Sequence, residues 1–223
     1  MGVRVVTTLI IPAPSYDLVD LATVHDELSI KTSDISKDAF LSRAITQIST
    51  AMAGHCNRVF PQETLQDAIY PARDAYPYQL PGGIRRLQLS RWPIVSVSSV
   101  TKTEFPGDIY ILAEGTDFLI EAEVGQLTRL AQYTGYPADW YPVVTTVIYT
   151  AGYAIIPDDL QDAALRLITT RFFNRGRDPT MKSQTQPGLG DQTYWVGSIP
   201  GVRGAFPEDI MAMLDRYRVP VIA

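Results

Sequence analysis

VVTTVIYTAGYAIIPDDLQDAALRLITTRFFNRGR, residues 143–177, is the stretch that decides the fold. Its first part is rich in β-branched and aromatic residues, which predicts a strand beginning at Val143. Ala151-Gly152-Tyr153 interrupts this run. Pro157 then stands where the first helical residue is expected, because a helix start leaves that N–H unpaired in any case. Apolar residues recur at three- and four-residue steps up to Phe172, so one helix face is apolar. A buried strand that leads into a buried helix forms a core and is not by itself a functional site.

Charged residues occupy positions that suit the dipole of this expected helix. Asp158 and Asp159 lie in its first turn, and Arg171, Arg175 and Arg177 lie near its C-terminal end. Two adjacent carboxylates also suit a metal site or acid–base chemistry, and clustered arginines suit phosphate binding. A capped helix start and a solvated helix end explain the same residues more simply. We therefore expect this helix to be structural.

Three segments, taken in order, resemble one protein family. They are Tyr149-Thr150-Ala151-Gly152-Tyr153 with the following Pro157-Asp158-Asp159-Leu160, the segment RWPIVSVSSV at residues 91–100, and Leu214-Asp215-Arg216-Tyr217-Arg218. Their order and spacing, together with the N-terminal helices, resemble the head–tail connector (adaptor) proteins of tailed double-stranded DNA bacteriophages. The resemblance covers most of the chain.

The resemblance implies a structural protein of the virion neck, assembled in the host cytoplasm. Such proteins form a cyclic ring, expected here to be a dodecamer, between the portal protein and the tail or stopper proteins. DNA passes through the channel during ejection. The resemblance also implies that the helical part carries the ring, that the β part faces outward or toward the tail, and that the C-terminal segment reaches the portal. We expect neither enzyme activity nor a cofactor.

The C-terminal segment supplies the residues expected at the portal or ring interface. An apolar end follows a polar stretch, residues 176–206, whose composition does not bury enough apolar surface to order itself. Exposed apolar ends normally mark an interaction surface. The resemblance and the apolar tail together assign this contact to Ile210, Met213, Leu214, Tyr217, Arg218 and Val221. The alternative is that the tail packs back on its own domain.

The overall composition argues against several classes of partner. The chain has 223 residues, of which 46% are hydrophobic, and a formal net charge of −5. An acidic balance argues against a surface that grips nucleic acid through its phosphates. No apolar run reaches the ~20 residues of a membrane helix. The single cysteine, Cys56, excludes an intramolecular disulfide. The expected partners are therefore proteins, with DNA only passing by and no membrane.

The N-terminal part predicts an extended segment followed by two helices. Residues 1–16 are expected to form an arm or an edge strand, residues 18–30 a short helix, and residues 38–58 a long amphipathic helix. The expected caps are Asp17 or Asp20 for the first helix, and Ser36 or Asp38 with Asn57 for the second.

Short alternating segments between about residues 65 and 151 predict an antiparallel β meander, with a bulge at Ser98-Ser99. The predicted fold class is therefore α+β. The N-terminal helices (about 18–58) and one C-terminal core helix (157–175) form a small bundle, with the meander inserted and the terminal arms extended. The predicted domains are residues 1–175, and a flexible loop with a docking arm at residues 176–223.

Other chemistry has little support in the sequence. His25 and His55 are the only histidines, His55-Cys56 does not have metal-ligand spacing, and no nucleophile elbow is present. A second hypothesis is a β-rich ligand- or carbohydrate-binding module. It requires that an aromatic cluster be exposed and concave, whereas core packing is the commoner use of such residues. The cluster comprises Tyr133, Tyr136, Trp140 and Tyr141.

Overall fold

The computed structural model of the chain describes residues 4–70, 86–104, 107–131, 134–140, 143–175, 183–186, 190–193 and 206–219. The fold is α+β, as expected, and it divides into two compact units. The β unit comprises residues 1–14 and 61–154, and the helical unit comprises residues 15–60 and 155–223. This division differs from the predicted boundary at residue 175, because the C-terminal helix packs against the other helices of its own unit.

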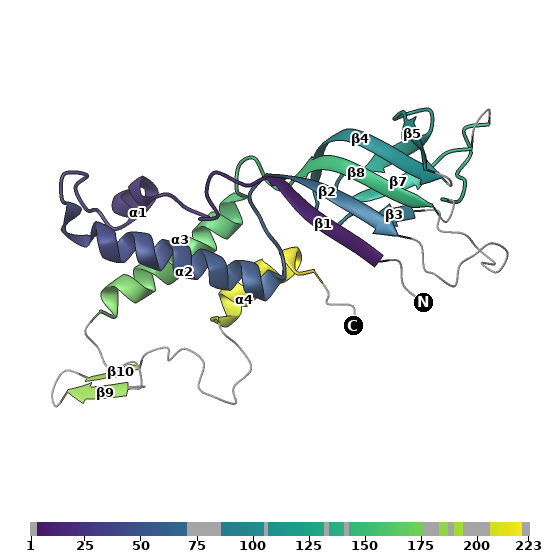
Figure 1. Ribbon diagram of the computed structural model, residues 1–223. Coiled ribbons are helices and arrows are strands. Elements are labelled where there is room, and N and C mark those ends of the chain that lie inside the picture. Colours follow the sequence, from purple (N-terminus) through teal and green to yellow (C-terminus); the bar gives the residue numbers. More distant parts are fainter. Residues whose placement is uncertain are drawn as a thin grey trace. The chain divides into compact units, whose positions relative to one another are not determined.

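The β unit contains a five-stranded antiparallel sheet (Figure 1). In spatial order its strands are β1 (Arg4–Ile11), β2 (Glu63–Tyr70), β8 (Val144–Ala151), β4 (Ile94–Glu104) and β5 (Asp108–Leu112). The strand predicted from β-branched residues, β8, is the central one and pairs with both β2 and β4. The N-terminal segment forms the edge strand β1, so the edge-strand prediction is confirmed.

A three-stranded antiparallel sheet completes the β unit. It consists of β3 (Arg86–Gln88), β7 (Gln126–Arg129) and β6 (Phe118–Glu121). Side chains of β2 and β8 alternate between buried and partly exposed, as expected where one side of a sheet packs on a core. A single apolar cluster joins the two sheets and includes Leu65, Ile69, Leu87, Leu89, Val100, Phe118, Leu127, Trp140, Val147 and Tyr149. The predicted β meander is confirmed.

The predicted bulge in β4 is also confirmed. The register between β4 and β8 shifts between Val97 and Ser99, and a second shift lies between Ile94 and Ser96. An extra residue bends the strand and re-aims the side chains that follow it. The bulges therefore explain why the alternation of this segment slips in the sequence.

The helical unit is organised around one long helix. This helix, α2 (Asp38–Cys56), contacts three others: α1 (Leu21–Glu27), α3 (Asp158–Phe173) and α4 (Glu208–Leu214). Short 3₁₀ turns precede α2 at η1 (Ile35–Lys37) and follow α4 at η3 (Asp215–Tyr217). The core of the unit is apolar and includes Val24, Leu41, Ile45, Met52, Phe60, Leu160, Ala164, Ile168, Ile210 and Leu214.

The helix ends confirm some predicted caps and correct others. The carboxylate of Asp20 accepts the backbone N–H of Thr23 at 2.7 Å, and hydrogen bonds from Thr23 lower the pKa of Asp20 below its ordinary value. Asn57 closes α2 in the left-handed conformation, with φ 49°. The predicted cap of α2 by Ser36 or Asp38 is wrong, because Lys37 occupies that position without a side-chain hydrogen bond. Asp38 instead binds His25. Pro157 is itself the cap of α3, since its ψ of 140° is not helical.

Two further strands lie in the stretch that composition marked as a loop. These strands, β9 (Ser183–Gln186) and β10 (Gly190–Thr193), pair antiparallel. The remainder of residues 176–205 lies outside the described residues, so its mobility stays a prediction. Within the described ranges, no helix combines the length and the apolar character needed to cross a membrane.

Gly152 provides the first test of the fold. The backbone of this residue has φ +106°, and a Cβ at this position would lie 2.4 Å from the Pro61 carbonyl oxygen. Neither the backbone conformation nor the neighbouring backbone tolerates a side chain. Gly152→Ala should therefore lower the free energy of unfolding by at least about 1–3 kcal/mol in denaturant titrations.

Gly54 in α2 is the matched control. A Cβ there meets nothing within 4 Å, and the residue lies in the last turn of α2 with no unusual backbone angle. Gly54→Ala should raise the free energy of unfolding by about 0.5–1 kcal/mol. Equal effects of the two substitutions would contradict the close approach of Gly152 to Pro61.

The core of α3 provides the second test. Leu167 is only partly buried, whereas the adjacent Ile168 is fully buried among the other helices. Ile168→Ala should cost about 2–5 kcal/mol of unfolding free energy, because it leaves a cavity. Leu167→Ala, at the position that helical spacing alone also suggests, should cost less. A larger loss of melting temperature from Leu167→Ala would mean that the faces of α3 are assigned incorrectly.

Candidate functional site

The C-terminal helix α4, where the portal-contact residues were expected, packs on its own helical unit. Phe206, Ile210 and Leu214 are all buried, and the last two are only 2% and 0% exposed. Residues four apart lie on the same face of a helix, so Ile210 and Leu214 form one apolar side that contacts α2 and α3. The prediction that the apolar tail lacks a partner in its own chain is therefore wrong.

Polar contacts hold the segment after α4 in place. The Cys56 thiol donates to the Leu214 carbonyl at 3.5 Å, and the backbone N–H of Val219 donates to the Cys56 carbonyl at 2.9 Å. The Tyr217 hydroxyl donates to the Asp159 carboxylate at 2.7 Å, and its ring meets Phe60 edge-on. The C-terminal segment thus binds the end of α2 and the start of α3 together.

The predicted interface residues consequently fall into three groups. Ile210 and Leu214 are inaccessible within the helical unit, so they cannot make a direct contact with another protein while the unit is folded. Met213 and Tyr217 are partly exposed and Arg218 is exposed. Val221 lies outside the described residues. The sequence pattern led us to predict that Ile210 and Leu214 contact another protein. The i, i+4 spacing of apolar residues in α4 indicates a buried face, and it does not indicate whether the partner is internal or external.

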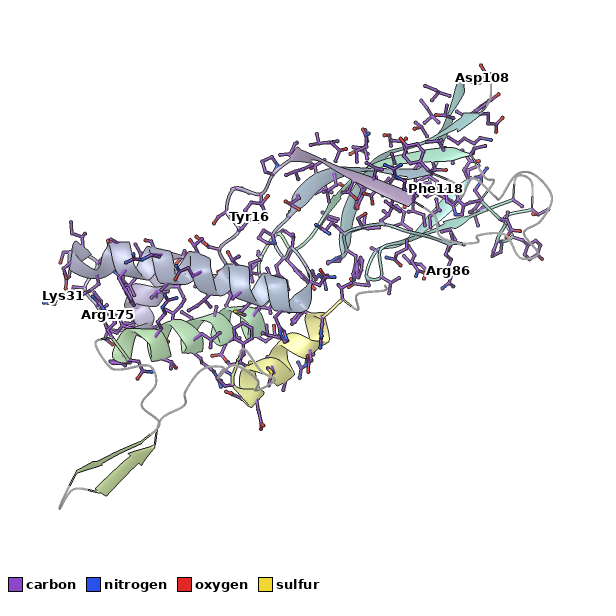
Figure 2. All side chains as sticks on the ribbon, turned by 60° about the horizontal axis from the view of Figure 1, so that its bottom comes forward. Tyr16, Lys31, Arg86, Asp108, Phe118 and Arg175 are labelled. Atoms are coloured by element: carbon purple, nitrogen blue, oxygen red, sulfur yellow. The ribbon has the colours of Figure 1, made fainter. Side chains whose placement is uncertain are left out.

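An aromatic and cationic cluster lies at the end of the α2–α3 pair. Arg175, labelled in Figure 2, lies over the Phe40 ring with 4.3 Å between its guanidinium carbon and the ring centroid. Phe172 packs between Phe40 and Phe173, and Phe173 is 72% exposed. Arg175 therefore stacks on aromatic rings. From the sequence, we expected this arginine only to complement the helix dipole at a solvated helix end.

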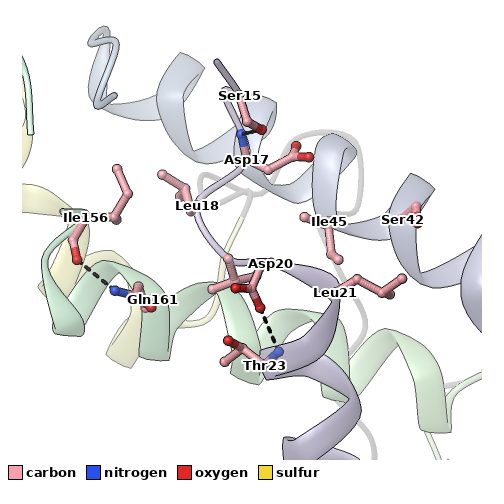
Figure 3. A pocket seen from close by; sticks show the side chains of 11 residues that line it. Ser15, Asp17, Leu18, Asp20, Leu21, Thr23, Ser42, Ile45, Ile156 and Gln161 are labelled. Atoms are coloured by element: carbon pink, nitrogen blue, oxygen red, sulfur yellow. Dashed lines mark hydrogen bonds between the residues drawn. The ribbon is translucent and has the colours of Figure 1, made fainter. Parts of the chain in front are cut away.

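A hollow of about 410 Å³ lies beside the start of α1 (Figure 3). Its wall includes Asp17, Asp20, Ile45 and Gln161. Two of these polar groups serve the fold, since Asp20 caps α1 and the Gln161 amide donates to the Ile156 carbonyl at 2.7 Å. A ligand site needs polar groups that converge on a bound molecule. The hollow therefore assigns no chemistry by itself.

The candidate catalytic residues have structural roles. His25 is buried and its Nε2 lies 2.9 Å from the Asp38 carboxylate, while His55 packs edge-on against Phe206. The Asp159 carboxylate accepts hydrogen bonds from the backbone N–H of Leu160 and from the Tyr217 hydroxyl. Among the described residues, no group of three or more His, Cys, Asp or Glu side chains is arranged to hold a metal.

Sequence reasoning missed a buried polar network in the β unit. The Asp67 carboxylate is fully buried, and its Oδ2 accepts the Tyr149 hydroxyl and the Ser90 N–H, both at 2.8 Å. The Tyr149 oxygen in turn accepts the Arg91 N–H at 3.1 Å. Burial, followed by the charge and the hydrogen bond of Asp67, raises the pKa of Tyr149. The alternation that places Asp67 on the same side as Leu65 and Ile69 is the signal that indicates this burial.

Two of the four residues in the aromatic cluster required by the carbohydrate-binding hypothesis lie within the described ranges, and they differ in exposure. Trp140 is buried, and its indole N–H donates to the Leu127 carbonyl at 3.2 Å. Tyr136 is exposed, but Tyr133 and Tyr141 lie outside the described residues. Trp140 therefore belongs to the core of the β unit, which is the commoner use of such residues, and it does not meet the requirement of the carbohydrate-binding hypothesis.

The packing of α4 gives a third test. Leu214→Ala should lower the unfolding free energy by about 2–5 kcal/mol, because the side chain is fully buried. Burial raises the pKa of the Cys56 thiol to about 11, so a maleimide should label the native chain slowly at neutral pH. Labelling should become faster in Leu214→Ala, because this substitution loosens α4 over Cys56.

Met213→Ala is the control for this test, because the side chain of Met213 is only partly buried in the same helix. Met213→Ala should change both the melting temperature and the labelling rate less than Leu214→Ala does. Removal of the chain from Phe206 onward should destabilise the helical unit more than Leu214→Ala does. An unchanged melting temperature after this truncation would restore the idea of a free docking arm.

Comparisons with known proteins agree on one kind of particle. A chain in the neck of an empty GTA particle, computed with C6 symmetry, is 18% identical with a TM-score of 0.56, over 98% of this chain and 97% of that chain. A chain in the virion of a native gene transfer agent (GTA) particle is 16% identical with a TM-score of 0.55, over 97% of each chain. A chain in the neck of a native GTA particle, computed with C12 symmetry, is 16% identical with a TM-score of 0.53, over 98% and 97%.

No model of a known protein family matches the chain, and no curated protein matches it. The likeness to the three structures is therefore one of fold. It extends over nearly the whole of this chain and of each matched chain.

Proposed function

We propose that this chain is a structural protein of the neck of a phage-like particle. The observation that carries the proposal is the shared fold, which extends over 98% of this chain and 97% of a chain from a GTA particle neck. Both units of the chain are included in the match. The family resemblance of the Tyr-Thr-Ala-Gly-Tyr segment and of the segment before Tyr217 supports the same class of protein.

The finer proposal is that copies of the chain form a ring between the portal and the tail. The matched necks were computed with C6 and C12 symmetry, and a closed ring is the usual product of a repeated contact between identical copies. The net charge of −5 suits a channel through which DNA passes without being held. The chain acts in this proposal by positioning and sealing, with no chemical step.

The contact with the portal is proposed for the accessible part of the C-terminal segment. Met213, Tyr217 and Arg218 remain available on it, while Ile210 and Leu214 hold α4 on the helical unit. The segment therefore presents a contact on an already folded helix. Such a contact loses less conformational entropy on binding than an arm that must first be ordered.

Particles produced without this chain test the proposal. Heads without tails that lose their DNA are expected in electron micrographs, because the joint between portal and tail is missing. Supplying the wild-type chain should restore tails. Normally tailed particles in the complete absence of the chain would contradict the proposed function.

A charge substitution tests the portal contact separately. Arg218→Glu should reduce the fraction of tailed particles without changing the melting temperature, because Arg218 is exposed on the C-terminal segment. Lys31→Glu makes the same change of charge on the loop after α1 and serves as the matched control. Equal effects of the two substitutions would assign the loss to net charge and not to the C-terminal segment.

A further inference from the structure

The side of the five-stranded sheet that points away from the core has an unusual composition. Directly opposed residues of antiparallel strands point to the same side, so the register identifies a row that crosses all five strands. This row consists of Val6, Ala68, Thr146, Thr101 and Ile111. We call the side centred on it the outer face.

The outer face is almost free of charge. A second row, next to the first, consists of Thr8, Gln66, Ile148 and Ser99. Among the described residues of the five strands, Arg4 at one corner is the only charged residue with this orientation. None of the side chains in these two rows is buried. A sheet face that is exposed only to water normally carries charged and strongly polar residues.

The three-stranded sheet of the same unit shows the ordinary pattern for comparison. On its side away from the core, Arg86 lies 3.6 Å from the Glu121 carboxylate and the Gln126 amide donates to Gln88 at 3.0 Å. Thr128 also donates to Glu121, at 3.2 Å. The outward side of the three-stranded sheet therefore carries the paired charged and polar side chains that are typical of a solvent-exposed sheet face. The outer face of the larger sheet lacks these features.

The two edges of the outer face are also unprotected. In β5, Ile109 and Ile111 point to this side and are 67% and 79% exposed. In β1, Val6 and Ile11 do the same. Edge strands of isolated proteins are usually guarded by lysines, prolines or a covering segment. Exposed β-branched residues at both edges extend the uncharged surface to the limits of the sheet.

We propose that the outer face is the surface by which one copy of this chain contacts the next copy in the ring. This assigns a ring contact to the β unit, whereas the family resemblance implied that the helical part carries the ring. The inference rests on the proposed function, which supplies the ring. The occupant is a second copy because each copy carries a net charge of −5, and a contact surface without carboxylates on one of the two partners reduces the repulsion between copies. The outer face has no carboxylate in either row. Depletion of charge is also the compositional mark of the centre of a protein interface.

The size of the outer face agrees with this role. Five strands about 4.8 Å apart and roughly eight residues long cover on the order of 600 Å². A stable interface buries about 800 Å² on each partner. The face supplies most of that area, and the exposed edges β1 and β5 supply more. In a closed ring each contact joins two different patches, so the face meets another surface of the neighbouring copy and not its own equivalent.

Lysine substitutions on the outer face test the inference in the purified full-length chain. Native mass spectrometry should show closed oligomers larger than a dimer for the wild type. Thr146→Lys, at the centre of the face, and Ile111→Lys, at its edge, should each raise the concentration needed for assembly by at least about tenfold, because each places an unpaired charge in the contact. Thr146→Val, which keeps shape and neutrality, should assemble like the wild type. Melting temperatures confirm that each variant is folded.

Several results would overturn the inference. A wild-type chain that stays monomeric, or that stops at a dimer, excludes a ring contact through this face. Normal assembly of both lysine variants does the same. Loss of assembly only in Gln47→Lys, on the exposed side of α2, would assign the ring to the helical unit. The proposed function fails on a different observation, namely normally tailed particles without the chain, so the two failures are distinguishable.

Discussion

The hydrogen bond from Tyr149 to the buried carboxylate of Asp67 is the polar interaction on which the β unit depends. A carboxylate without exposure to water destabilises a fold unless it is hydrogen-bonded, and here β8 and the backbone before β4 both donate to one oxygen, Oδ2. A register slip of one residue would turn Asp67 to the outside and Gln66 into the core. The network therefore fixes the pairing of β2 with β8, and the same pairing places Thr146 and Thr150 of β8 on the outer face and Thr145 on the core side.

The helical unit depends on apolar packing and not on a buried polar network, because its last helix, α4, completes its core. Leu214 fills a position over Cys56, and the segment after it returns to the end of α2 through Val219. The segment after α3 spans a long polar stretch before α4, yet the apolar side of α4 finds its partners within the same unit. Ordering of α4 is thus part of folding. A protein that docks on this segment meets a preformed surface, so the free energy of docking is not reduced by the cost of forming the helix.

The sequence predicted most of this fold where the pattern was local. The strand–helix order around Gly152, the bulge near Ser98, and the Asp20 and Asn57 caps each follow from a few neighbouring residues. The surface on which α4 packs was not predictable, because an apolar helix face indicates that it is buried and does not indicate which element buries it. Asp67 was missed because propensity treats an acidic residue as exposed, although its alternation with Leu65 and Ile69 indicated the core side. Pairing between strands distant in sequence, which defines the outer face, appears only when the register is known.

The composition of the outer face also explains what kind of assembly such a contact supports. Uncharged polar residues make up about half of the two rows, namely Thr8, Gln66, Ser99, Thr101 and Thr146, so burial of this face removes less apolar surface than a core of leucines would. Each contact between copies is therefore modest in free energy. In a closed ring, however, every copy makes two such contacts, and the last copy to enter makes both at once, which raises its effective affinity without any new kind of contact. A face of this composition thus favours complete rings over open chains of copies.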